Sequence, residues 1–254
     1  MYCANSVQKL LEKRIKTYLD MLSKEERNCF CTNLRSKEEP WGFLHLLFKV
    51  HKIPLKTRTV VSYYGNLLHP LGQLITEYLQ PLARRQRSNF QDSFTLKKEL
   101  DLQKLPSNAR LFICDATSMY TNIKTGPALQ HIGQFFLENK KHLTVSPAVL
   151  MDALRLIMTN NVFQFGDKYW IQKVGTEMGA PPTPIWATIF FGIHEVTVLA
   201  QFGDKLQLYR RFIDDVLGIW LVDPDPDEDH QQWTLFVALI QDYYGLEWIF
   251  EERY

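Results

Sequence analysis

The segment Leu206-Gln-Leu-Tyr-Arg-Arg-Phe-Ile-Asp214-Asp215-Val-Leu-Gly-Ile-Trp-Leu221 is the most informative part of this sequence. Apolar residues lead up to two adjacent aspartates and away from them, which predicts a strand, a tight turn and a second strand. Two neighbouring like charges repel each other, and a divalent cation relieves this repulsion because hard cations prefer carboxylate oxygens. An Asp-Asp turn is also common as a plain solvated turn, so its surroundings decide how it is interpreted.

A third aspartate occurs in a similar setting upstream. Asp115 ends the apolar run Ala109-Arg-Leu-Phe-Ile-Cys114, and a helix is expected to begin near Pro127. If the strands that carry Asp115 and Asp214 are neighbours in one sheet, three carboxylates converge. Such a set could bind two Mg²⁺ ions about 3.5–4 Å apart, with Mn²⁺ as the alternative, to activate a 3′-hydroxyl and stabilise a leaving pyrophosphate.

The elements expected around these aspartates follow the order β-α-β-β-α-β, the split βαβ arrangement. In that order the first strand and the hairpin strands are sheet neighbours, so Asp115 should lie beside Asp214 and Asp215. Gly245 is expected to end the last helix. The expected helices span 6–23, 67–83, 92–104, 127–139, 146–160, 185–200 and 229–244, and the expected strands span 42–50, 57–64, 110–115, 161–165, 168–173, 206–221 and 246–252.

Composition and charge limit the class of protein. The chain has 254 residues, 46% of them hydrophobic, and a net charge of +1. Residues 40–110 hold eleven Lys/Arg and four Asp/Glu, whereas residues 204–254 hold four and twelve. This asymmetry suits a protein that binds a phosphate backbone and performs chemistry on it. With no signal peptide and no apolar run near 20 residues, we expect an intracellular protein, nuclear or cytoplasmic, without a membrane partner.

Four ordered motifs resemble those of reverse transcriptases over roughly residues 40–254. Phe212-Ile-Asp214-Asp215 is similar to the aromatic-x-Asp-Asp box, and Asp115 with Tyr120 is similar to the Asp-x4-aromatic box. Gly175-Thr-Glu-Met178-Gly179-Ala-Pro-Pro-Thr-Pro184 resembles the glycine-turn box, and Lys49-Val-His-Lys52 with Arg58-Thr-Val-Val-Ser62 resembles the fingers hairpin. The patterns Lys-x-His-Lys, Asp-x-Thr-Ser-x-Tyr-Thr-Asn-Ile and Gly-Thr-x-Met-Gly-x-Pro are most similar to Penelope-like retroelements.

The resemblance implies an α+β fold with fingers at 1–105 and a palm at 106–254. The palm would be a split βαβ, ferredoxin-like antiparallel sheet with helices on one face. The sequence departs from the family in two respects. It carries no thumb and no GIY-YIG endonuclease, and the glycine-turn box has Pro-Pro-Thr-Pro where a middle closer to Thr-Pro-Met-Ala is typical. The second departure weakens the expectation of template grip but not that of metal binding.

The resemblance also implies roles for individual residues. Asp115 and Asp214 would bind both metal ions, with Asp215 as a weaker ligand and the Ala116 carbonyl completing one site. Tyr120 would exclude the ribose 2′-hydroxyl. The remaining expected contacts are Lys52, Arg58 and, less specifically, Lys49 to the triphosphate, Met178 and Gly179 to the nucleotide, and Arg84, Arg85 and Arg87 to template phosphates.

The implied function is RNA-directed DNA synthesis from deoxynucleoside triphosphates on an RNA template and a DNA primer. Two alternatives stay open. A catalytically inactive nucleic-acid-binding remnant of a retroelement would explain the missing thumb, and an RNA-templated RNA polymerase shares the palm and the aspartates. Tyr120 argues against the RNA polymerase. An unrelated α+β protein would leave the ordered motifs unexplained, and the sequence does not indicate the oligomeric state.

Overall fold

The structure is a computed structural model that describes residues 4–19, 23–24, 27–28, 40–50, 53–244 and 246–253. The chain forms two compact units that are discontinuous in sequence. The first unit comprises Met1–Tyr78 with Thr144–Thr183, and the second comprises Leu79–Leu143 with Pro184–Tyr254. The boundary near residue 105, between the fingers and the palm that the reverse-transcriptase resemblance implies, is a division by function. It is not tested by these units and stays a prediction.

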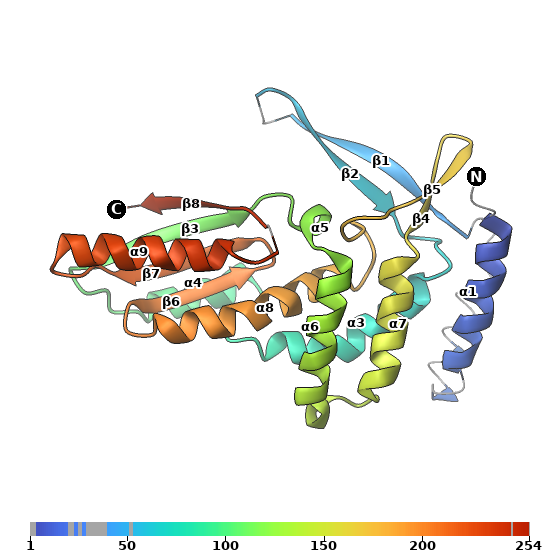
Figure 1. Cartoon of the computed structure of the whole chain (residues 1–254), viewed down its shortest axis with the longest axis horizontal. Helices are drawn as coiled ribbons and strands as arrows, with labels where there is room; N and C mark the ends of the chain where they lie inside the picture. Colours follow the sequence, from blue (N-terminus) through green and yellow to red (C-terminus); the bar gives the residue numbers. More distant parts are fainter. Residues whose placement is uncertain are drawn as a thin grey trace. The chain divides into compact units, whose positions relative to one another are not determined.

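The first unit contains a four-stranded sheet with the order β2-β1-β4-β5 (Figure 1). A long hairpin of β1 (Gly42–Lys49) and β2 (Lys56–Ser62) forms one half, and a short hairpin of β4 (Val162–Phe165) and β5 (Lys168–Ile171) forms the other. β4 joins β1 in parallel. The unit also contains helix α1 (Ala4–Leu19), helix α7 (Pro147–Thr159) and the first part of α3 (His69–Arg84).

Helix α1 is fixed to α7 by polar contacts at its C-terminal half. Tyr18 Oη donates to Asp152 at 2.5 Å, and Arg14 Nη2 donates to the same carboxylate at 2.7 Å. Leu11 and Ile15, one turn apart, are buried on the same helix. The amphipathic helix expected at the N-terminus is therefore confirmed over the residues described.

The second unit contains a four-stranded antiparallel sheet with the order β6-β7-β3-β8. This order is the split βαβ arrangement expected from the sequence. The strands are β3 (Ala109–Ala116), β6 (Leu206–Phe212), β7 (Asp215–Leu221) and β8 (Trp248–Arg253), and the long helices are α6 (Thr125–Glu138), α8 (Thr183–Gln201, most of which lies in this unit) and α9 (Pro226–Gln241). The fold is thus α+β with a ferredoxin-like palm sheet.

One face of this sheet carries the aromatic core. Phe112 on β3 contacts Trp233 and Phe236 of α9 edge-on, at centroid distances of 5.1 and 5.7 Å, and Figure 1 shows α9 running along the sheet. Gly218 of β7 is required here, because a Cβ at this position would lie 2.1 Å from Phe112 Cζ. Helix α8 lies against the same face at β6, where Tyr209 bonds to Glu195. The opposite face contacts α4 (Ser93–Asp101) at β6.

Strand β6 has an irregular register near its start. Leu206 pairs with Trp220 and Leu208 pairs with Ile219, so Gln207 is an extra residue in a β-bulge. The side-chain amide nitrogen of Gln207 donates to Gln103 Oε1 at 3.2 Å and to the carbonyl of Lys104 at 3.1 Å. The bulge is therefore held by side-chain contacts from the segment that follows α4.

Some expected features differ in the structure. α9 begins at Pro226 and ends at Gln241, so the expected span of 229–244 was shifted toward the C-terminus, and Gly245 lies outside the described residues. The cause is Asp225, whose carboxylate accepts from the Asp227 amide at 3.0 Å and caps the helix early. Asp229, in the first turn of α9, is buried and accepts from Trp220 Nε1 at 2.9 Å. The short helices α5 (Met119–Asn122) and η1 (Lys140–His142) were not expected.

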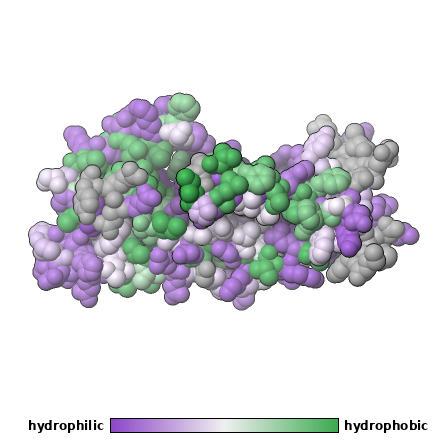
Figure 2. Space-filling view, turned by 90° about the horizontal axis from the view of Figure 1, so that it is seen from above, coloured by the Kyte–Doolittle hydropathy of each residue, from purple (hydrophilic) through white to green (hydrophobic). Residues whose placement is uncertain are grey.

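Within the described part of the chain, helix α8 is by length and composition alone long and apolar enough to cross a membrane, but most of it is buried inside the protein. Apolar side chains also occur at the surface, with Phe48 exposed by 62% and Trp170 by 52%. Figure 2 shows apolar patches among hydrophilic residues on one face.

Candidate functional site

The strand register brings the predicted aspartates together at one end of the palm sheet. Asp115 on β3 pairs directly with Asp215 on β7, and the Ala116 amide donates to the Asp214 carbonyl at 3.0 Å. Cys114 and Val216, the strand neighbours of these aspartates, are buried on the aromatic face. Asp115 and Asp215 therefore lie on the opposite face, where both are exposed. The expected adjacency of the three aspartates is present in the fold.

The carboxylates of this cluster influence one another. The pKa of Asp215 is raised above its ordinary value, first by burial and then by the charges of Asp214 and Asp115. A cluster of hard oxygen donors that repel each other fits a divalent cation by donor type. Among the residues that the structure describes, no three His, Cys, Asp or Glu side chains are grouped so that they could hold a metal ion. The metal role of the aspartates therefore stays a prediction.

The turn that carries Asp214 has an unusual backbone. Ile213 has φ +58°, in the left-handed region that β-branched residues rarely adopt. Conformations of this kind cost on the order of 1–3 kcal/mol and persist only where the surrounding structure holds them. Such strained residues are frequent at functional sites, which supports a functional role for this turn.

A buried polar network lies directly behind the turn. Arg211 is 0% exposed, and its Nε and Nη2 donate to the two oxygens of Glu195 at 2.6 and 3.0 Å. Ser88 and Tyr209 donate to the same carboxylate at 2.5 and 2.8 Å. Burial raises the pKa of Glu195, but the charge and hydrogen bonds of Arg211 outweigh it and hold the pKa below its ordinary value. This pair was not predicted from the sequence, although an arginine on the core face of a strand indicates a buried partner.

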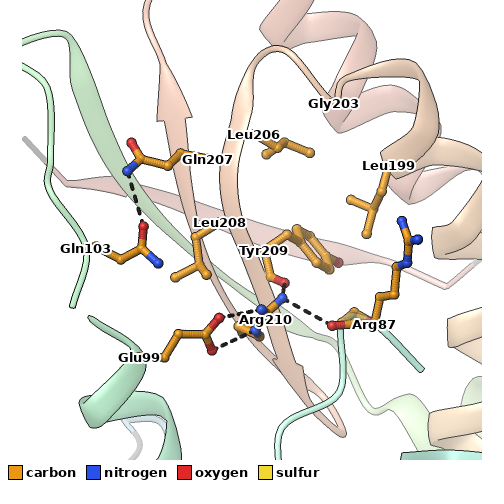
Figure 3. A pocket seen from close by; sticks show the side chains of 11 residues that line it. Arg87, Glu99, Gln103, Leu199, Gly203, Leu206, Gln207, Leu208, Tyr209 and Arg210 are labelled. Atoms are coloured by element: carbon orange, nitrogen blue, oxygen red, sulfur yellow. Dashed lines mark hydrogen bonds and ion pairs between the residues drawn. The ribbon is translucent and has the colours of Figure 1, made fainter. Parts of the chain in front are cut away.

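The preceding residue anchors the strand on its other face. Arg210 forms a bidentate ion pair with the carboxylate of Glu99 on α4, and its Nη1 donates to the carbonyl of Arg87 at 3.1 Å (Figure 3). These contacts line a pocket of about 340 Å³ between α4, β6 and the end of α8. Adjacent arginines therefore fix β6 from both faces, immediately before the Asp214 turn.

Tyr120 lies close to Asp115 in the chain. β3 ends at Ala116, Ser118 takes a left-handed conformation with φ +48°, and Tyr120 is the second residue of α5. The chain thus leaves the strand at once and places Tyr120, which is half-buried, in the same unit as the aspartates. Its proposed role against the sugar remains a prediction.

The basic residues of the β1–β2 hairpin share one face of the first unit's sheet. Lys49 pairs directly with Lys56, and Leu47 pairs with Arg58 two positions away, so all three cations lie on the same side. Like charges at directly opposed positions destabilise a hairpin, which a bound polyanion would relieve. Lys56 was not among the sequence candidates, although the two-residue alternation identifies it. Lys52 lies outside the described residues.

The glycine-turn box is attached to β2. The Val61 amide donates to the Met178 carbonyl at 3.1 Å, and Gly179 has φ +114°. A Cβ at Gly179 would lie 2.2 Å from the Val61 carbonyl oxygen. The close packing against β2 is therefore enough to explain why a glycine occupies position 179. The contacts of Met178 and Gly179 with a nucleotide remain predictions.

Glu177, within the same box, is buried among polar groups that lack partners. Its Oε1, the Tyr63 hydroxyl and the Thr176 hydroxyl make no hydrogen bond within the described chain. Burial raises the pKa of Glu177 to about 8. The burial of Glu177 was not predicted, because the motif was recognised by the neighbouring Met178 and Gly179.

The three arginines expected to contact the template lie at and just after the end of α3. Arg84, Arg85 and Arg87 are exposed, and Arg85 Nη1 lies 3.3 Å from His142 Nε2. The Arg87 carbonyl, as noted, is used by Arg210. Their exposure is compatible with phosphate contacts and equally with a solvated helix end, so their role remains a prediction.

No family model and no curated protein matches this sequence. Solved structures do match. The telomerase of Candida albicans in complex with an RNA fragment has a TM-score of 0.62 at 14% identity, over 97% of this chain and 47% of that one. Apo telomerase of Candida tropicalis gives 0.59 at 13%, over 85% and 44%. The BmCPV RNA-dependent RNA polymerase in its quiescent state gives 0.61 at 14%, over 91% and 21%.

The chain thus spans less than half the length of each of these structures. At such low identity the similarity concerns the fold, which is that of polymerase fingers and palm. The more specific resemblance to Penelope-like retroelements is not tested by these neighbours. The chain has the fingers and palm architecture that telomerase reverse transcriptase and viral RNA polymerases share.

Proposed function

We propose that this chain is the fingers and palm portion of a template-directed nucleotide polymerase, and more specifically of an RNA-directed DNA polymerase related to Penelope-like retroelements. The observation that supports this most is the pairing of Asp115 with Asp215, beside Asp214, at one end of the palm sheet. This placement was expected from the β-α-β-β-α-β order of the predicted elements, and the similarity in fold to polymerase structures also supports the proposal.

Mg²⁺, or Mn²⁺ in its place, would be held by Asp115, Asp214 and Asp215, with the Ala116 carbonyl nearby. Bound ions would supply charge stabilisation to a 3′-hydroxyl nucleophile and a pyrophosphate leaving group. The chain itself offers no covalent nucleophile in this proposal. Its residues bind and orient the reactants. Lys49, Lys56 and Arg58 attract the triphosphate, and Tyr120 restricts the sugar. Arg84, Arg85 and Arg87 contact the phosphates of an RNA template that is paired with a DNA primer.

Primer extension tests the proposal. The full chain is incubated with an RNA template, a DNA primer, deoxynucleoside triphosphates and Mg²⁺, and Asp115→Asn and Asp214→Asn are compared with Asp167→Asn, a control in the β4–β5 turn. We expect extension that both palm variants abolish and the control retains. Binding of primer–template without extension, unchanged by the palm variants, would support the inactive remnant instead.

The similarity to a viral RNA-dependent RNA polymerase makes RNA synthesis the second candidate. Replacing deoxynucleotides by ribonucleotides in the same assay separates the two functions. Preference for ribonucleotides would favour the RNA polymerase, and it would remove the role assigned to Tyr120.

A further inference from the structure

One guanidinium connects the protein core to the strained turn. Arg211 Nη1 donates to the Ile213 carbonyl at 2.9 Å. That carbonyl belongs to the peptide that joins Ile213 to Asp214, so its orientation determines how the backbone enters Asp214. Ile213 is left-handed, a state that its branched side chain disfavours. A fixed donor at this carbonyl is the kind of restraint that such a backbone needs.

The guanidinium is itself immobilised. Two of its nitrogens donate to Glu195, and Nη2 also donates to the Thr188 carbonyl at 3.0 Å. Both backbone polar groups of Arg211 bond to the segment 88–90: its amide donates to the Ser88 carbonyl at 2.7 Å, and its carbonyl accepts from the Phe90 amide. Arg211 therefore cannot turn away from Ile213 without breaking several buried bonds.

Stability alone does not account for this arrangement. A buried ion pair costs desolvation, and well-packed apolar residues of similar volume often stabilise a fold equally well. An apolar pair could not present an N–H group to the Ile213 carbonyl. Arg211 and Glu195 are 0% and 2% exposed, so neither side chain meets solvent or a ligand directly. What the ion pair provides, and an apolar pair would not, is an N–H donor held against the Ile213 carbonyl.

We propose that Arg211, held by Glu195, is a positioning residue that maintains the left-handed Ile213 and thereby the placement of the Asp214 carboxylate for metal binding. The inference rests on the metal role assigned to Asp214 in the proposed function. Arg211 acts through the backbone and touches no reacting group.

The test removes the pair without leaving a buried charge. Arg211→Met combined with Glu195→Met is compared with wild type, and Ile213→Gly is introduced into both backgrounds because glycine adopts the left-handed region without strain. The matched control is Arg210→Met with Glu99→Met, which removes the ion pair on the other face of β6. Arg211→Lys serves as a second variant, because its compact ammonium cannot bond Glu195, Thr188 and Ile213 together.

Two readouts are measured on folded protein, with thermal unfolding as the check. Backbone scalar couplings report φ at Ile213, and Mg²⁺ alone is titrated while the Asp214 amide is followed by NMR. In the Met/Met variant we expect Ile213 to leave the left-handed region and Mg²⁺ affinity to fall on the order of tenfold, equivalent to 1.4 kcal/mol. Ile213→Gly should restore most of the loss, and the Arg210/Glu99 control should bind Mg²⁺ as wild type does.

Unchanged couplings and Mg²⁺ affinity in the Met/Met variant would overturn the inference. The inference would also be overturned if the effects of the Met/Met change and of Ile213→Gly on Mg²⁺ affinity were additive. The Arg211–Glu195 pair would then stabilise the core without acting through Ile213. If the Met/Met variant does not fold, Arg211→Lys is judged by the same criteria. If wild type does not bind Mg²⁺, the proposed function fails, and the Ile213 couplings alone decide whether Arg211 holds the turn.

Discussion

Tyr120 follows Asp115 by five residues, after the left-handed Ser118 and within a four-residue helix. We expect Tyr120→Ala to admit ribonucleotides while largely preserving deoxynucleotide use, because exclusion of a 2′-hydroxyl by an aromatic ring is steric. The change in discrimination should be at least about tenfold, or about 1.4 kcal/mol. The measurement is the ratio of kcat/KM values for the two sugars in a primer-extending protein.

Tyr64→Ala, at an exposed tyrosine of the first unit, is the control. If Tyr120→Ala keeps the wild-type ratio, Tyr120 is a structural residue, and the sequence argument against an RNA polymerase loses its main support.

Glu177 gives a prediction for pH. Burial raises its pKa from 4.5 to about 8 in the folded chain, so the folded state binds a proton that the unfolded state releases at lower pH. This contribution to stability is complete below about pH 4.5 and is lost as the pH rises to about 8. Glu177→Gln mimics the protonated form and should remove the dependence. Relative to this variant, the wild type should lose up to about 1.4 kcal/mol per pH unit within this window.

Denaturant unfolding at a series of pH values measures the effect, with the exposed Glu77→Gln as control. If the free energy of unfolding depends on pH in the same way for wild type and Glu177→Gln, the prediction is wrong. The Glu177 carboxylate would then be solvated in the folded protein.

At the scale of elements, the β1–β2 hairpin carries two lysines at directly opposed positions. Lys56→Glu converts the repelling pair with Lys49 into an attracting one, so we expect a higher melting temperature. The same change should weaken binding of nucleoside triphosphate by reversing a charge on the cationic face. Lys168→Glu, on β5 and opposite Phe165, is the control for charge reversal in the same sheet.

Differential scanning fluorimetry and triphosphate binding give the two measurements. A variant that gains stability and keeps its triphosphate affinity would show that this face of the hairpin does not bind the nucleotide.

The elements also show how far the sequence was informative. The apolar runs on both sides of Asp214-Asp215 and before Asp115 indicated strands, and the order of elements gave their pairing, because the split βαβ arrangement leaves few alternatives. The Arg211–Glu195 pair was not found, since nothing local in the sequence joins β6 to α8. α9 was misplaced because Asp225 caps the helix early and Asp229, in its first turn, is buried and bonded to Trp220, whereas acidic residues are usually solvated. Roles that depend on ligands stay predictions.

At the scale of the whole molecule, the basic segment 40–110 predicts salt-dependent binding of nucleic acid. Each phosphate contact contributes about 0.9 to the slope of log affinity against log salt on a duplex and about 0.7 on a single strand. Replacing Arg84, Arg85 and Arg87 together by Gln should therefore lower the slope by about 2–3 if all three contact phosphate. The measurement is primer–template affinity at several salt concentrations.

The matched control replaces Lys9, Lys13 and Lys16, three exposed lysines on α1, and so removes the same charge from outside the basic segment. Equal slopes for the two triple variants would mean that the arginines act only through net charge.

The bulge at Gln207 has a consequence for how β6 tolerates insertions and deletions. Side chains on a strand alternate between faces, so a residue gained or lost between Leu208 and Phe212 would exchange the surroundings of Arg210 and Arg211 and leave an unpaired cation in the aromatic core. Loss of Gln207 itself would only convert the bulge into regular pairing, since the pairs from Leu208 to Phe212 stay unchanged. Length variation in functional homologues should therefore be confined to the end of β6 that lies before Leu208.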